Sequence, residues 1–168
     1  IHSLRAAENF PITGTQVSRW PGFIKAIAQV KKAAAIVNLE FGVISKEQSE
    51  AIIKACDDVA AGKLNNEFIV DVIQGGAGTS TNMNANEVIA NRALEHLGFS
   101  KGDYEHLHPN DQVNASQSTN DVYPTALKVA TWYGILDLLR AMHELRLAFE
   151  KKAEEFKAVL KITRPMVW

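Results

Sequence analysis

The feature that most constrains this chain is a helical pattern that begins at Thr119 and continues past Glu150. Pro124 falls in the first turn, where its missing N–H costs little. Apolar residues then recur at spacings of three and four, which is typical of a helix. One apolar stripe consists of Leu138, Met142, Leu145, Phe149, Ala153, Phe156 and Leu160, and a second face carries Trp132, Leu136, Leu139 and Leu147. The pattern predicts one long helix with apolar side chains on two faces.

Such a helix is too long for a compact chain of this size. At the usual rise per residue it would reach roughly 57 Å. A compact domain of 168 residues has a diameter of only about 40 Å. We therefore expect the chain to be a piece of a larger protein or a subunit of an assembly, in which other helices cover the apolar faces.

The rest of the chain also has a helical pattern. Residues 1–18 are mixed in character and are expected to form an irregular entry segment, and residues 99–118 a polar connection. Three helices are expected between them, from Pro21 to Gly42, from Ser45 to Gly62 and from Asn82 to Leu97. The predicted fold class is all-α. It consists of an amino-terminal helical domain, residues 1–118, and the first long helix of a central helical bundle, residues 119–168.

Composition narrows the classes of function. Hydrophobic residues make up 46% and charged residues 22%, which fits a soluble globular protein. A net charge of −1 without a basic stripe argues against a nucleic-acid partner. No apolar run reaches the roughly 18 residues that span a membrane. The lone Cys56 excludes an internal disulfide and a cysteine zinc site, and it fits a reducing, cytoplasmic location. No metal site and no cofactor are predicted.

Two polar segments stand where helices begin. The first, residues 75–84, combines three glycines with the hydroxyls of Thr79, Ser80 and Thr81, and the second, residues 116–121, is again rich in hydroxyls and amides. Glycines allow a close approach to backbone N–H groups, and helix amino termini attract anions. The presence of two such segments suggests that they bind the two ends of a small dicarboxylate, or that they hold one carboxylate from two sides. Helix capping by Ser118 or Thr81 is the alternative.

Other motifs fit less well. The glycines lack the Gly-Lys-Ser/Thr ending of a phosphate-binding loop and the spacing of a dinucleotide fingerprint. His108 lies in the polar connection, where an ordinary exposed histidine is the alternative to a binding role. The remaining histidines show no metal-ligand spacing, and structural roles are expected for them; these are His2, His96, His106 and His143.

The two polar segments also resemble a known family. Residues 76–87 and 108–121 are similar to two hallmark stretches of the aspartase/fumarase superfamily, and residues 4–10 and 31–35 resemble it as well. The resemblance covers residues 2–160. Within the superfamily the aspartase branch is favoured, because class II fumarases usually carry Gln at the position of Ser80 and Ser at that of Thr119.

The resemblance implies roles for individual residues. Thr79, Ser118 and Thr119 would hydrogen-bond the substrate carboxylate beside the carbon that loses its proton. Asn120 would contact the departing amino group, and Ser80 would line the same pocket. A secondary dicarboxylate-binding loop would comprise His108, Asn110 and Asp111.

The activity that the resemblance implies is the reversible elimination of ammonia from L-aspartate to give fumarate. In the family the active sites form where three subunits of a homotetramer meet, and the general base is a serine on a loop farther downstream. No catalytic base is therefore expected in this chain, and the chain alone should be inactive. Residues 161–168 depart from the Gly-Arg-Thr stretch that follows the long helix in the family. A fumarate hydratase and a non-catalytic structural fragment remain as alternatives.

Overall fold

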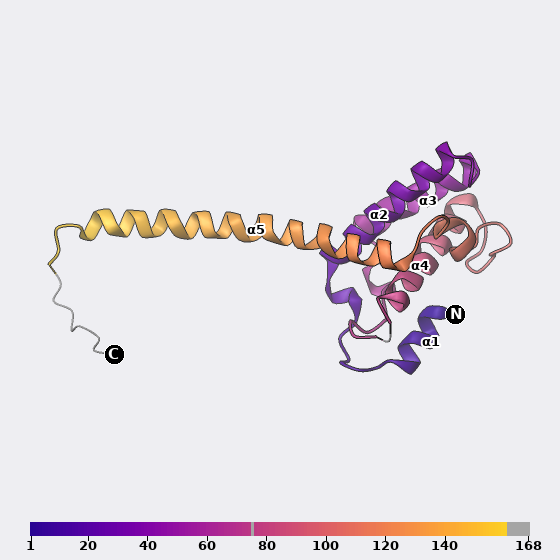
Figure 1. Cartoon of the computed structure of the whole chain (residues 1–168), viewed down its shortest axis with the longest axis horizontal. Helices are drawn as coiled ribbons and strands as arrows, with labels where there is room; N and C mark the ends of the chain where they lie inside the picture. The colour runs from indigo at the N-terminus through magenta and orange to yellow at the C-terminus, as the bar shows by residue number, and fades with distance from the viewer. Residues whose placement is uncertain (75, 161–168) are drawn as a thin grey trace. The chain divides into compact units, whose positions relative to one another are not determined.

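A computed structural model describes residues 1–74 and 76–160, so that Gly75 and residues 161–168 lie outside the described residues (Figure 1). Its elements are α1 (His2–Asn9), η1 (Val17–Arg19), α2 (Pro21–Glu40), α3 (Lys46–Ala60), η2 (Asn65–Glu67), α4 (Thr79–Leu97), η3 (Pro109–Val113) and α5 (Thr119–Phe156). Within this part of the chain there is no β-strand, and Gln16 and Asp71 form an isolated bridge. The all-α prediction is confirmed.

Helices α2 and α3 lie side by side and follow their sequence signals (Figure 1). Pro21 occupies the first turn of α2, where proline is favoured. Ser45 caps α3 through a reciprocal pair of hydrogen bonds with Gln48, each 3.2 Å long. A cap of this kind contributes about 1 kcal/mol to the stability of the folded protein. Helix α4 packs against α3, and the buried core between these helices includes Ile24, Ile27, Ile52, Val59, Ile89 and Leu94.

The prediction of an irregular segment over residues 1–18 is wrong, because His2–Asn9 form helix α1. The carboxylate of Glu87, on α4, accepts hydrogen bonds from the backbone N–H groups of His2 and Ser3 and from the Ser3 hydroxyl. These groups are the unpaired donors at the start of α1. Burial alone would raise the pKa of Glu87, yet these hydrogen bonds and that from the terminal ammonium lower it to about 2. Because the capping residue is distant in sequence, no local sequence pattern predicts this cap.

The later elements differ from the predictions only in detail. Helix α4 begins at Thr79, three residues before the expected Asn82, and the predicted polar connection contains the π-helical turn η3. Helix α5 spans 38 residues from Thr119 and passes Glu150, as its apolar spacing predicts. The chain divides into two units, Ile1–Trp132 and a second that begins at Tyr133.

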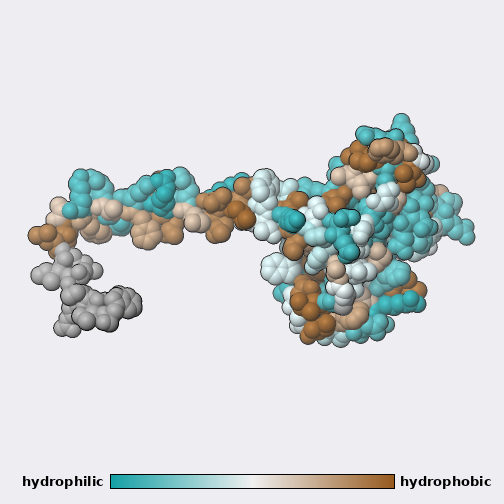
Figure 2. All heavy atoms as spheres, viewed as in Figure 1, coloured by the Kyte–Doolittle hydropathy of each residue, from teal (hydrophilic) through white to brown (hydrophobic). Residues whose placement is uncertain are grey.

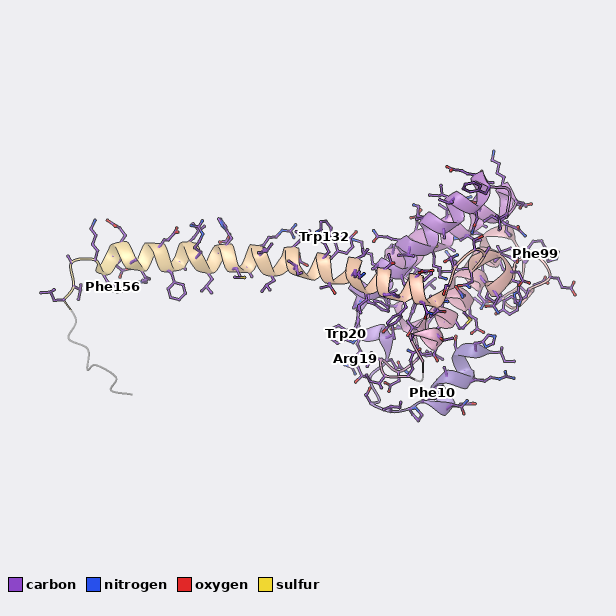
Figure 3. The ribbon with its side chains drawn as sticks, in the orientation of Figure 1. Phe10, Arg19, Trp20, Phe99, Trp132 and Phe156 are labelled. Carbon is purple, nitrogen blue, oxygen red and sulfur yellow. The ribbon has the colours of Figure 1, made fainter. Side chains whose placement is uncertain are left out.

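In the second unit, α5 keeps its apolar side chains in solvent. Figure 2 shows apolar residues along one side of this part of the helix and polar residues along the other. The members of the predicted stripe from Leu138 to Phe149 are each more than half exposed, and so is Phe156, labelled in Figure 3. Among the described residues no helix is long and apolar enough to cross a membrane.

Asp58, on α3, joins three basic groups in the first unit. Its carboxylate accepts hydrogen bonds from Lys63 Nζ and, at 2.7 Å, from Arg92 Nε, and it lies 3.0 Å from His96 Nε2. The hydrogen bond from Lys63 is the largest influence on the carboxyl pKa, and with those from Arg92 and His96 it lowers the pKa below its ordinary value despite the opposing effect of burial. Because the pKa is lowered by folding, the carboxylate stabilises the fold above pH 3.8, its ordinary pKa, and the stabilisation is lost as the pH falls below it.

We expect Asp58→Asn to lower the free energy of unfolding at pH 7 by about 1–3 kcal/mol, because Lys63, Arg92 and His96 lose their ionised acceptor. The neighbouring Asp57→Asn is the matched control: Asp57 is exposed and, among the described residues, its carboxylate forms an ion pair with Lys32, so its loss should cost less than about 1 kcal/mol. Urea titrations at pH 7 and near pH 2.5 measure both. A penalty for Asp58→Asn that is equally large at the lower pH would contradict the account.

Candidate functional site

The glycine-rich segment ends in a residue that the fold requires to be glycine. Gly78 has a φ of +89° and stands directly before α4. A Cβ on Gly78 would lie 2.3 Å from Cγ of Tyr123, on α5. The Tyr123 ring in turn meets Phe23 edge-on, with ring centroids 5.4 Å apart. Gly78 therefore lets the loop before α4 lie directly against the first turns of α5.

The hydroxyls that follow Gly78 have different surroundings. Gln74 Oε1 accepts a hydrogen bond from the Thr81 backbone N–H at 2.9 Å, and Gln74 Nε2 donates to Thr81 Oγ1 at 2.6 Å. Thr81 is buried and serves the helix start, as the capping alternative requires. Thr79 is exposed and Ser80 half-buried, and neither hydroxyl has a hydrogen-bond partner among the described residues. Within the part of the chain that the structure describes, both hydroxyls are therefore available to a ligand.

The second polar segment forms the beginning of α5. Ser118 Oγ accepts a hydrogen bond from the Asn120 backbone N–H at 3.2 Å, which is a capping contact. A hydroxyl that accepts one hydrogen bond still has its own hydrogen to donate. Thr119 is half-buried, and Asn120 is exposed. Among the described residues, Ser118 thus makes a structural contact and keeps a hydroxyl hydrogen that it can donate.

A buried asparagine connects the two segments. Asn82, in the first turn of α4, donates through Nδ2 to Thr119 Oγ1 at 3.0 Å. The starts of α4 and α5 therefore lie next to each other (Figure 1). A cavity of about 340 Å³ is lined by residues of the glycine-rich segment, of the chain before it and of the start of α5, namely Val72, Ile73, Gln74, Gly76, Ala77, Gly78, Asn120, Tyr123 and Pro124. The structure thus brings together the two segments that the sequence singles out.

A buried lysine lies behind this contact. Lys31, on α2, is 0% exposed, and its Nζ donates to Asn114 Oδ1 at 2.8 Å. The same oxygen accepts a hydrogen bond from Asn82 Nδ2 at 3.1 Å. Burial lowers the pKa of Lys31 to about 7, and a Coulombic interaction with Cys56 opposes the shift. No sequence pattern singles out Lys31, Asn82 or Asn114, although all three fall within the family-like stretches.

The second group of candidates gathers around η3. His108 Nδ1 accepts a hydrogen bond from the Asn110 backbone N–H at 3.2 Å and lies 3.4 Å from Asp111 Oδ2. A ring nitrogen that accepts from Asn110 cannot also donate to Asp111, so the capping bond and an ion pair exclude each other. The Asn110 side-chain oxygen is buried without a partner among the described residues. Within the same residues, no group of three or more His, Cys, Asp or Glu could hold a metal ion.

Comparison with known proteins gives consistent matches. Residues 1–165 match a family described as Lyase. The aspartate ammonia-lyase of Helicobacter pylori (strain J99) is 56% identical over 164 residues, and that of Escherichia coli K12 is 50% identical over 165 residues. Each alignment covers 98% of this chain but only 35% and 34% of the relatives. The chain spans about a third of the length of the curated relatives it matches.

Solved structures agree with these matches. A Brucella melitensis protein described as a fumarate lyase:delta crystallin superposes with a TM-score of 0.96 and 52% identity, covering 99% of this chain and 39% of that one. A class II fumarase from Schistosoma mansoni superposes with a TM-score of 0.72 and 38% identity, covering 77% of this chain and 27% of that one.

The contact between Gly78 and Tyr123 gives a test of how the site is held together. Gly78→Ala should destabilise the protein by roughly 1–2 kcal/mol for the left-handed backbone and by about 1–3 kcal/mol more for the clash with the ring. Gly98→Ala is the matched control, because Gly98 has a φ of +84° and no atom near its missing Cβ. Thermal melts of both variants measure the difference. Equal losses would show that the ring does not constrain the loop.

Proposed function

We propose that this chain is the amino-terminal part of an aspartate ammonia-lyase. The chain belongs to the lyase family whose model matches residues 1–165. The proposal is supported by identities of 50–56% with aspartate ammonia-lyases over nearly the whole chain. The reaction is the reversible elimination of ammonia from L-aspartate to give fumarate. The observation that carries the proposal is the hydrogen bond from Asn82 to Thr119, which joins the first turn of α4 to the first turn of α5, the two segments that carry the candidate hydroxyls.

The elimination reaction explains why hydroxyl groups at the starts of α4 and α5 would be useful. A base removes the proton beside one substrate carboxylate, and the electron pair of the C–H bond moves into that carboxylate to form an aci-carboxylate. The new C=C bond then forms as the C–N bond breaks and ammonia leaves. Thr79, Ser118 and Thr119 would donate hydrogen bonds to the aci-carboxylate oxygens. Donors aimed at charge that develops in the transition state lower the barrier more than they strengthen substrate binding.

Two neighbouring residues complete this wall of the site. Asn120 lines the cavity from the first turn of α5, where its amide would contact the amino group that leaves. Ser80 would line the same pocket with a free hydroxyl. The cluster of His108, Asn110 and Asp111 would form a secondary dicarboxylate-binding loop, for which the unpaired oxygen of Asn110 offers a buried polar group.

The larger architecture is also part of the proposal. Residues 1–118 would form an amino-terminal domain and residues 119–168 the start of a central helical bundle. The exposed apolar stripe of α5 supports assembly with further helices, in a homotetramer as the resemblance implies. The location would be cytoplasmic, and the buried thiol of Cys56 is free.

Fumarate hydratase is the runner-up, since it uses the same elimination with water as the leaving group. It is less well supported, because the class II fumarase matches at lower identity and over less of this chain. Ser80 and Thr119 also depart from the residues that class II fumarases usually carry.

In the full-length enzyme, Thr79→Ala and Thr119→Val should each lower kcat/KM by about 100-fold, which corresponds to roughly 2.7 kcal/mol for one lost oxyanion donor. Asn120→Ala should slow the reaction and weaken discrimination between aspartate and malate. Thr81→Ala is the matched control, because the Thr81 hydroxyl bonds Gln74; it should lower the melting temperature and leave kcat/KM nearly intact. Steady-state kinetics and thermal melts decide. If the Thr79 and Thr119 variants lose stability and keep their rate, these residues only support the helices.

The chain of 168 residues on its own should not release ammonia from L-aspartate. The resemblance implies that the general base is a serine farther downstream, and the chain spans about a third of its relatives. It should also self-associate through the exposed stripe of α5. Fumarate absorbance and light scattering at micromolar concentration measure the two properties. Turnover that rises with the concentration of pure chain, or a clean monomer, would count against this part of the proposal.

A further inference from the structure

Four side chains form a continuous hydrogen-bonded chain that ends at the candidate site. Lys31 Nζ donates to Asn114 Oδ1 at 2.8 Å, Asn82 Nδ2 donates to that oxygen at 3.1 Å, and the same Nδ2 donates to Thr119 Oγ1 at 3.0 Å. We call this set, Lys31, Asn114, Asn82 and Thr119, the amide relay. Lys31 and Asn82 are both 0% exposed, so bulk water does not compete for these groups.

The direction of each hydrogen bond in the amide relay is fixed by its anchor. Asn114 Nδ2 donates to the backbone carbonyl of Gln117 at 3.2 Å, and a carbonyl can only accept. Asn114 must therefore turn its oxygen toward Lys31 and Asn82. Since that oxygen is also a strict acceptor, Asn82 must present its NH₂ group. That group also faces the hydroxyl of Thr119.

These fixed directions determine where the hydroxyl hydrogen of Thr119 can point. Because Oγ1 accepts from Asn82, the hydroxyl hydrogen cannot point toward Asn82 and is available in another direction. A hydroxyl can otherwise rotate and act as donor or acceptor with similar ease. The amide relay makes Thr119 a donor before any ligand arrives, and such preorganised donors are what stabilise a developing oxyanion.

We propose that Asn82 and Asn114 are positioning residues that, anchored by Lys31, hold the Thr119 hydroxyl as a hydrogen-bond donor toward the substrate carboxylate. This inference rests on the proposed function, in which Thr119 binds that carboxylate. Neither asparagine needs to touch the substrate.

The unpaired oxygen of Asn82 supports a role for its NH₂ group. Asn82 Oδ1 is buried and has no hydrogen-bond partner among the described residues, which is unfavourable for folding. Turning the amide over would place the oxygen against Asn114 Oδ1 and remove the donor to Thr119. Asn84, two residues along α4, offers a comparison, because its Nδ2 donates to the Glu67 carbonyl at 3.0 Å and its oxygen is likewise unpaired. Asn84 makes no contact with the amide relay in the hydrogen bonds of the described residues.

The test is the isosteric change Asn82→Asp in the full-length enzyme. The carboxylate replaces the NH₂ group by an acceptor, so the Thr119 hydroxyl must turn and donate to it. We expect kcat and kcat/KM to fall together by about 100-fold, as on loss of one oxyanion donor. Asn84→Asp is the matched control, since it makes the same change at a buried site of the same helix. It should lower the melting temperature and leave kcat within a few-fold of the parent.

The double variant Asn82→Asp/Thr119→Val separates the relay from the proposed function. If Asn82 acts through Thr119, the double variant should be about as slow as either single variant, because the two residues act as a unit. If Thr119→Val slows the enzyme and Asn82→Asp does not, or if the two losses add, the amide relay is overturned and the proposed function stands. If Thr119→Val keeps full activity, the carboxylate-binding role of Thr119 is wrong and the inference fails with it.

A second pair of variants decides the matter if Asn82→Asp does not fold. Asn114→Leu has a similar size and offers no acceptor to Asn82, so kcat should fall as far as in Thr119→Val. Asn84→Leu makes the same change outside the amide relay and should leave kcat within a few-fold of the parent. Equal kcat values for Asn114→Leu and Asn84→Leu would overturn the inference.

Discussion

The hydrogen bond from Asn82 to Thr119 is the contact on which the site depends. It joins the first turn of α4 to the first turn of α5, two segments that lie 37 residues apart in sequence. The missing side chain of Gly78 allows the adjoining loop to meet the Tyr123 ring at the same junction. If either contact were lost, one link between the start of α4 and the start of α5 would be removed.

One buried charged group of this unit is connected to that junction by hydrogen bonds. Lys31 is fully buried, which is unfavourable for a charged group, and it is held by an amide oxygen rather than by a carboxylate. A carboxylate there would form a strong ion pair and would place a negative charge behind a site that is proposed to bind a dianion. The neutral amides of Asn114 and Asn82 transmit a hydrogen-bond direction without adding charge.

Sequence periodicity predicts the helices well and the polar contacts poorly. The spacing of apolar residues from Leu138 to Phe156 defines α5, and the Ser45 cap defines the start of α3. Helix α1 is not predicted, because the residue that caps it is Glu87, more than eighty residues away in sequence. Thr79 and Thr119 can be chosen as candidates from the glycines and helix starts beside them. The partner of the Thr119 hydroxyl cannot, because it depends on how the helices pack.

The most direct test of the central claim is a crystal structure of the full-length enzyme with L-aspartate or fumarate bound. We expect one carboxylate to lie beside the cavity lined by Gly78 and Asn120, within hydrogen-bond distance of the hydroxyls of Thr79, Ser118 and Thr119. Asn82 should still donate to Thr119 in that complex. A ligand that contacts none of these hydroxyls, or a Thr119 hydroxyl that donates to Asn82 instead, would contradict it.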